Sequence, residues 1–121
     1  MKVFFQDRDI STKNRTELID ITDMVEETVR KSGITSGICI VHSVHSTTAI
    51  IVNEHEAGLI SDIVKKVQRD FPKGAGWLHD RVDDNADAHL ASSYIWTYKN
   101  ISSPLRQTSK RNMAKHIPTR T

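Results

Sequence analysis

Apolar residues recur at helical spacing in the middle of the chain, from Glu56 onward. The stripe consists of Leu59, Ile60, Ile63, Val64 and Val67. Polar and charged residues occupy the positions between them, so the pattern predicts an amphipathic helix with one face toward a core. Residues 71–76 contain a proline and two glycines, which predict the end of this helix and a loop after it.

Two apolar, β-branched runs precede this helix. They cover residues 37–44 and 47–52, and they predict two adjacent strands with the polar pair His45 and Ser46 at their junction. Strands that are followed by a helix and a polar loop are typical of an α+β domain. The sequence therefore predicts the α+β class.

The N-terminal third predicts two further strands and another helix. Short apolar runs at residues 3–5 and 16–21 are the predicted strands. Thr22 and Asp23 are candidate caps for a helix, because the apolar residues after them recur at helical spacing. Gly33 provides the residue type that most often ends a helix.

Length and cysteine content restrict the class of protein. A chain of 121 residues predicts one domain with a real core. The single cysteine, Cys39, excludes an intramolecular disulfide and a cysteine-rich zinc framework, and its apolar strand predicts a buried, inert thiol. Because no apolar segment is long enough for a signal peptide or a membrane span, we expect a soluble cytoplasmic protein without membrane partners.

Charge divides the chain into two unlike parts. Residues 1–95 contain all 15 acidic residues and 11 of the 17 lysines and arginines, whereas residues 96–121 contain the other six and no acid. We therefore expect a domain over 1–95 and an atypical basic tail over 96–121. Such a tail can bind nucleic-acid phosphates without sequence specificity, or it can be solvated and disordered, and the second alternative is favoured.

A dense polar cluster lies just before that boundary. Its members are Asp83, Asp84, Asn85, Asp87 and His89. This density indicates a functional site, although one of the first three residues is also suited to cap a helix that begins at Ala86. On a helix, Asp87 and His89 would point about 200° apart, so both reach one site only if the segment is extended.

His45 is a second candidate, because the small hydroxyl residues Ser46, Thr47 and Thr48 follow it. The alternative is a histidine at a strand end that bonds only to the backbone. Glu54 likewise has two interpretations. It is either a carboxylate that faces the site or a charge that stabilises the start of the helix after it.

These segments together resemble a known protein family. Three segments are similar to the motifs of the YjbQ family. They are residues 45–59 with Asn53 and Glu54, the pair His79 and Asp80, and residues 84–90. The resemblance covers about residues 1–95. It implies a β-sandwich with two principal helices, a homotrimer, and a secondary thiamine-phosphate synthase activity that joins a pyrimidine diphosphate to a thiazole phosphate.

The same resemblance implies a site for a phosphorylated small molecule or anion, with a divalent metal, zinc or magnesium. The implied metal ligands are His45, His79 and His89. The implied catalytic groups are His45, Asp87 and His89. The implied contacts to a substrate or cofactor are Asn85, Thr47 and Thr48.

After Ile95 the resemblance stops, where family members continue with a glycine, further strands and a Gly-Thr-Trp-Gln segment. Trp96 is encoded by TGG and the next codon begins with A, so reading one base later gives glycine. Met113 with the codon after it gives tryptophan in the same way. We therefore predict a one-base frameshift, missing C-terminal strands and a poorly packed tail. A nucleic-acid-binding module and a truncated, inactive homologue are the alternative functions, with nucleic acid the less expected partner.

Overall fold

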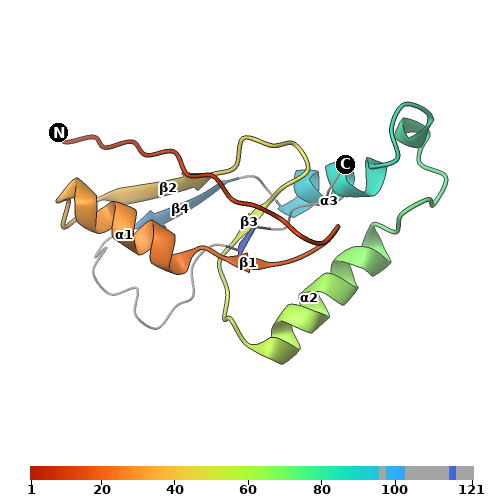
Figure 1. The fold of residues 1–121 in the computed structure, drawn as a ribbon, viewed down its shortest axis with the longest axis horizontal. Helices are drawn as coiled ribbons and strands as arrows, with labels where there is room; N and C mark the ends of the chain where they lie inside the picture. The colour runs from red at the N-terminus through yellow and green to blue at the C-terminus, as the bar shows by residue number, and fades with distance from the viewer. Residues whose placement is uncertain (96–97, 103–114, 117–121) are drawn as a thin grey trace.

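The computed structural model describes residues 1–95, 98–102 and 115–116 (Figure 1). The helices in these residues are α1 (Thr22–Ser32), α2 (Ala57–Asp70), the 3-10 helix η1 (Leu78–Arg81) and α3 (Ala86–Ile95). The strands are β1 (Ile19–Asp20), β2 (Ile38–His42), β3 (Ile50–Ile51), β4 (Tyr98–Ser102) and β5 (Lys115–His116). The predicted α+β class is confirmed.

The strands form two small antiparallel sheets. β2 pairs with β4 along five residues, from Ile38 opposite Ser102 to His42 opposite Tyr98. The second sheet has the order β1-β5-β3, so that His116 in β5 lies opposite residues of both neighbours. The predicted adjacent strands of residues 37–44 and 47–52 therefore exist only in part, and they pair with later strands instead of with each other.

The core lies where α1 meets the two sheets. Its centre consists of Ile21, Val25 and Ile50, each of which is less than a tenth exposed. Partly buried neighbours surround them, namely Ile10, Ile19, Met24, Val29, Cys39, Val41 and Ile101. Because every second residue of β2 points to one face, Cys39 and Val41 reach this core while Ile38 and Ile40 are exposed.

Helix α1 confirms the predicted helix and its end but corrects its start. Gly33 adopts a left-handed conformation with φ 68°, and its N–H donates to the carbonyl of Arg30. The expected caps Thr22 and Asp23 do not cap the helix through their side chains. Instead, Asp20 accepts hydrogen bonds from the backbone N–H and the hydroxyl of Thr22, at 3.0 and 2.5 Å.

Two of the predicted strands differ in the structure. Residues 3–5 are not in a strand, and Phe5 is 89% exposed. The segment 43–49 is outside the strands and contains a turn at residues 45–48, because the backbone N–H and the hydroxyl of Thr48 both donate to the carbonyl of His45. This turn takes residues 47–49 out of the strand that their β-branched side chains predict.

The basic tail contains two strands, although C-terminal strands were predicted to be missing. β4 and β5 both lie beyond Trp96, in a segment where the sequence shows no strand alternation. Ile101 in β4 packs against the core cluster, which gives this strand an apolar anchor. The expectations about packing at 96–97, 103–114 and 117–121 lie outside the described residues.

Helix α2 confirms the predicted amphipathic helix, although its apolar stripe is only half-buried. Glu56 caps it, because its carboxylate accepts from the backbone N–H groups of Gly58 and Leu59, both at 2.7 Å. The ring of Phe71, just after α2, contacts that of Tyr94 in α3 at a centroid distance of 5.4 Å. In the described residues, no helix is long and apolar enough to cross a membrane.

Candidate functional site

Two faces of helix α3 carry different candidate residues. Asp87 lies on one face and contacts Arg15, and His89 lies on the other and contacts His79. Residues 86–95 are helical, so the condition under which Asp87 and His89 would share one site is not met. The structure therefore separates two residues that were both expected in a single site.

The histidine face contains a close ring pair. The centroids of the His79 and His89 rings lie 4.9 Å apart, with an interplanar angle of 76°, which is an edge-on contact. His79 is exposed on η1, whereas His89 is half-buried on α3. The pair joins two segments that the sequence places ten residues apart, with one accessible ring and one held against the protein.

A carboxylate fixes the relative position of these two segments. Asp80 follows His79 directly, and its Oδ1 accepts from the backbone N–H of Ala86 at 3.1 Å. The carbonyl of His79 in turn accepts from the backbone N–H groups of Val82 and Asp83, at 2.9 and 3.2 Å. Asp80 is therefore the residue that connects η1 to the start of α3, a role that the sequence motif His-Asp did not reveal.

Asn85 occupies the position before α3 and is 1% exposed. Its backbone carbonyl accepts from the N–H groups of Ala88 and His89, at 3.1 and 3.2 Å. Its side-chain Oδ1 is buried without a hydrogen-bond partner in the described residues. One of Asp83, Asp84 and Asn85 was expected to cap α3. The residue that accepts from the N–H of Ala86 is instead Asp80.

The loop at residues 45–48 lies against the same helix. The hydroxyl of Ser92 in α3 donates to the carbonyl of Ser46, and the hydroxyls of Ser43 and Thr48 are hydrogen-bonded to each other. Thr48 is buried, Thr47 is half-buried and has a bonding partner, and His45 is exposed. The carbonyl of His45 accepts from Thr48, which agrees with the alternative of a histidine that bonds through the backbone.

The three expected metal ligands are not brought together. Among the described residues, no three histidine, cysteine, aspartate or glutamate side chains are placed to hold one ion. His79 and His89 form a pair, and His45 lies outside it. The chemistry available at this face is therefore that of two imidazoles, an exposed one and a half-buried one.

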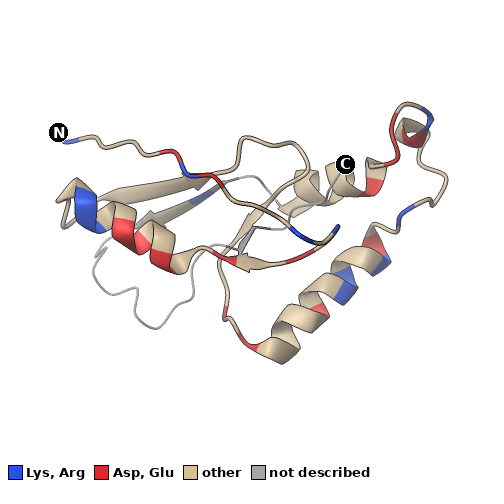
Figure 2. Cartoon of the chain, viewed as in Figure 1, with Lys and Arg blue, Asp and Glu red and all other residues tan. Residues whose placement is uncertain are grey.

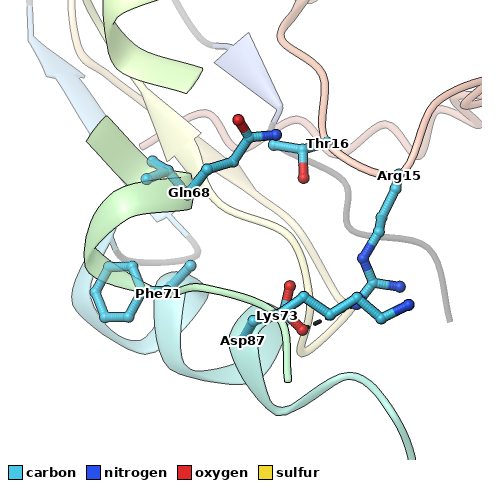
Figure 3. Close-up of a pocket in the computed structure, with 8 residues that line it drawn as sticks. Arg15, Thr16, Gln68, Phe71, Lys73 and Asp87 are labelled. Atoms are coloured by element: carbon cyan, nitrogen blue, oxygen red, sulfur yellow. Dashed lines mark hydrogen bonds and ion pairs between the residues drawn. The ribbon is translucent and has the colours of Figure 1, made fainter. Parts of the chain in front are cut away.

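The opposite face of α3 borders a small cavity of about 120 Å³ (Figure 3). Arg15, Thr16, Gln68, Phe71, Lys73 and Asp87 are among the residues that line it. Nη2 of Arg15 donates to Oδ1 of Asp87 at 2.9 Å and to the carbonyl of Asp84 at 3.1 Å. The sequence did not identify Arg15 as a partner of Asp87, because the two residues are 72 positions apart.

Charges of both signs lie close together in this part of the molecule (Figure 2). Nζ of Lys73 lies 3.5 Å from Oδ2 of Asp84, and both side chains are more than half exposed. Glu54 is exposed in the loop before α2, and the side chain that caps this helix is that of Glu56. The described surface around α2 and α3 thus has mixed charge.

Comparison with known proteins identifies a matching family and several relatives. A family model described as "UPF0047 protein YjbQ-like" matches residues 6–117. A UPF0047 protein of Methanothermobacter thermautotrophicus is 46% identical over 90 residues, which are 74% of this chain and 63% of that protein. One of Archaeoglobus fulgidus is 43% identical over 86 residues, 71% of this chain and 66% of that protein.

The chain therefore spans just under two thirds of these two relatives. A solved structure of a YbjQ-like protein from Sulfolobus solfataricus superimposes with a TM-score of 0.86 at 36% identity. This superposition covers 93% of the present chain and 83% of the other. The family model continues beyond residue 95, and the division of the chain at residue 96 stays a prediction.

Proposed function

Because the chain belongs to the YjbQ-like UPF0047 family, we propose that it is a cytoplasmic enzyme of the thiamine-phosphate synthase type. The main support for the location of its site is the edge-on contact between the rings of His79 and His89 beside the N-terminus of α3. The substrates would be a pyrimidine diphosphate and a thiazole phosphate. Diphosphate would be the leaving group.

The reaction sets clear demands on the site. The thiazole nitrogen forms a bond to the methylene carbon of the pyrimidine, and the bond from that carbon to the diphosphate oxygen breaks. The electron pair of the broken bond stays on the diphosphate, whose growing negative charge must be stabilised. Hydrogen bonds from imidazole N–H groups, together with the positive end of the α3 dipole, would supply that stabilisation.

Two imidazoles supply only part of a zinc site, which takes four ligands. Asp80, the nearest acid in sequence to His79, already accepts from Ala86, and the described residues offer no third ligand. The residues present therefore do not complete the zinc or magnesium site that we expected. A divalent metal at this face would need a further ligand from outside the described residues, and a second copy of the chain could supply it.

A second copy is part of the proposal. The outward face of β2 exposes Ile38 by 72% and Ile40 by 66%, which is unusual for two isoleucines on one strand face. We propose that the chain forms a homotrimer. In it, a neighbouring copy covers this face of β2, and a neighbouring copy also lies beside the histidine pair. Light scattering at several protein concentrations tests this, and a monomer at all of them would refute it.

The activity is tested by measuring thiamine phosphate formed from the two phosphorylated precursors. His89→Ala and His79→Ala are expected to lower the rate by about a hundredfold, within the range for loss of an acid–base group. His55→Ala is the matched control, because His55 is also exposed and belongs neither to the pair nor to the outward face of β2. Normal rates in both histidine variants would move the site elsewhere.

The wild-type protein has its own decisive outcome. If no turnover occurs with added zinc, magnesium or neither, the enzyme proposal fails and the inactive homologue is supported. Metal analysis of the purified protein, repeated on His89→Ala, tests the metal separately. Equal metal content in the two proteins would exclude His89 as a ligand.

A further inference from the structure

We infer that Arg15 is a positioning residue for His89, and that it acts through the first turn of α3. The inference rests on the proposed histidine site, which it deepens, and its structural test does not require turnover. Arg15 belongs to the N-terminal segment and is remote in sequence from the polar cluster. It nevertheless makes two contacts to the segment in which His89 begins its helix.

One terminal nitrogen of Arg15 makes both contacts. Nη2 carries two hydrogens, and it donates to the carboxylate of Asp87 at 2.9 Å and to the backbone carbonyl of Asp84 at 3.1 Å. These acceptors lie on either side of Asn85, the residue before α3. A single side chain therefore spans the point where the chain enters the helix.

That entry point sets the position of His89. The backbone N–H of His89 donates to the carbonyl of Asn85 at 3.2 Å, so any rotation of the turn moves the imidazole with it. Asp80 holds the same turn from the histidine side through the N–H of Ala86. Arg15 holds it from the cavity side, and the turn is fixed between the two.

The carboxylate of Asp87 is occupied by this role. Its side chain is only 11% exposed, and a charge at that depth needs a partner. Figure 3 shows Arg15 reaching Asp87 from the N-terminal segment, and both residues line the cavity. Asp87 therefore transmits the position of Arg15 to α3, while His89 faces the site.

A lysine cannot fully replace this arginine. The guanidinium presents rigid, directed donors, whereas the lysine amine is a compact charge on a shorter reach. We therefore expect Arg15→Lys to keep the charge opposite Asp87 but to restrain the turn less well. Arg15→Gln removes the charge and both directed contacts.

The test compares Arg15→Gln with Arg8→Gln. Arg8 is a matched control, because its side chain is 32% exposed, as is that of Arg15, and it also pairs with one carboxylate, that of Glu27. The readout is the nuclear Overhauser cross-peak between the His79 and His89 rings in histidine-labelled protein. We expect Arg15→Gln to lose it, Arg15→Lys to retain part of it, and Arg8→Gln to retain all of it.

An intact cross-peak in Arg15→Gln would overturn the inference. If that variant does not fold, Asp87→Asn and Arg15→Lys decide in its place, and unchanged cross-peaks in both would overturn the inference equally. If the synthase activity is found, Arg15→Gln should lower kcat about tenfold with KM within about twofold. The cross-peak requires no turnover, so absence of synthase activity in the wild type refutes the function without deciding the role of Arg15.

Discussion

Oδ1 of Asp80 accepts a hydrogen bond from the backbone N–H of Ala86 at 3.1 Å, and so joins the 3-10 turn to the helix that carries His89. A helix leaves its first N–H groups without intrahelical partners, and a side-chain acceptor satisfies one of them. Here the acceptor comes from six residues earlier instead of from the residue before the helix. The cap therefore also determines where His79 lies.

Replacing Asp80 with alanine should destabilise the start of α3. The loss of a capping acceptor costs about 1 kcal/mol of unfolding free energy, which urea denaturation will measure. Hydrogen exchange at the amide of Ala86 should become faster as well. Asp80→Asn is the control, because its amide oxygen can still accept, and an equal loss of stability in both variants would argue against the cap.

Glu56 should make the stability of α2 dependent on pH. Hydrogen bonds from the backbone N–H groups of Gly58 and Leu59 lower the pKa of its carboxyl below the ordinary value. Since the pKa is lower in the folded state than in the unfolded one, the ionised form stabilises the fold at neutral pH. That contribution is lost as the pH falls through the folded-state pKa.

Urea midpoints measured from neutral to acidic pH will check this for the wild type and Glu56→Gln. The glutamine variant should be less stable at neutral pH and should lose less stability on acidification. Parallel pH profiles for the two proteins would show that the capping bonds do not depend on charge.

Ile50 should be the most costly of the strand isoleucines to truncate. It is 2% exposed at the centre of the core, so Ile50→Ala leaves a cavity and should cost about 2–5 kcal/mol. Ile38→Ala deletes the same atoms from a side chain that is 72% exposed, and should change the stability of the monomer by less than about 0.5 kcal/mol. Denaturant unfolding of both variants tests the difference, and similar losses would mean that the face of Ile38 is buried in solution.

Cys39 should react slowly with thiol reagents in the folded protein. Burial in the face of β2 that meets the core raises the pKa of its thiol, so less of the reactive thiolate is present at a given pH. The rate should keep rising with pH beyond the point at which a free thiol has levelled off. Equal rates before and after unfolding in urea would contradict this.

The elements that could be predicted are those that a short stretch of sequence determines. The apolar spacing after Glu56 predicts α2, and the spacing before Gly33 predicts α1, because a helix is stabilised by neighbours three and four residues away. The separation of Asp87 from His89 also follows from the sequence once that segment is taken as helical.

The parts that could not be predicted depend on contacts between distant segments. Nothing local identifies Arg15 as the partner of Asp87, and nothing in β2 or β3 indicates that their partners are β4 and β5. The β-branched run after His45 suggested a strand, but hydrogen bonds from Thr48 close a turn there. Tertiary context thus overrides strand propensity at the point where the loop meets α3.

The ladder between β2 and β4 has a consequence for how such a chain changes over time. Its hydrogen bonds join backbone groups, which every residue other than proline provides in the same form. A strand at this position can therefore tolerate many changes of sequence, provided that one side chain such as Ile101 reaches the apolar interior. The pairing of β4 with β2 thus constrains the side chains of β4 at few positions and leaves the others free to diverge.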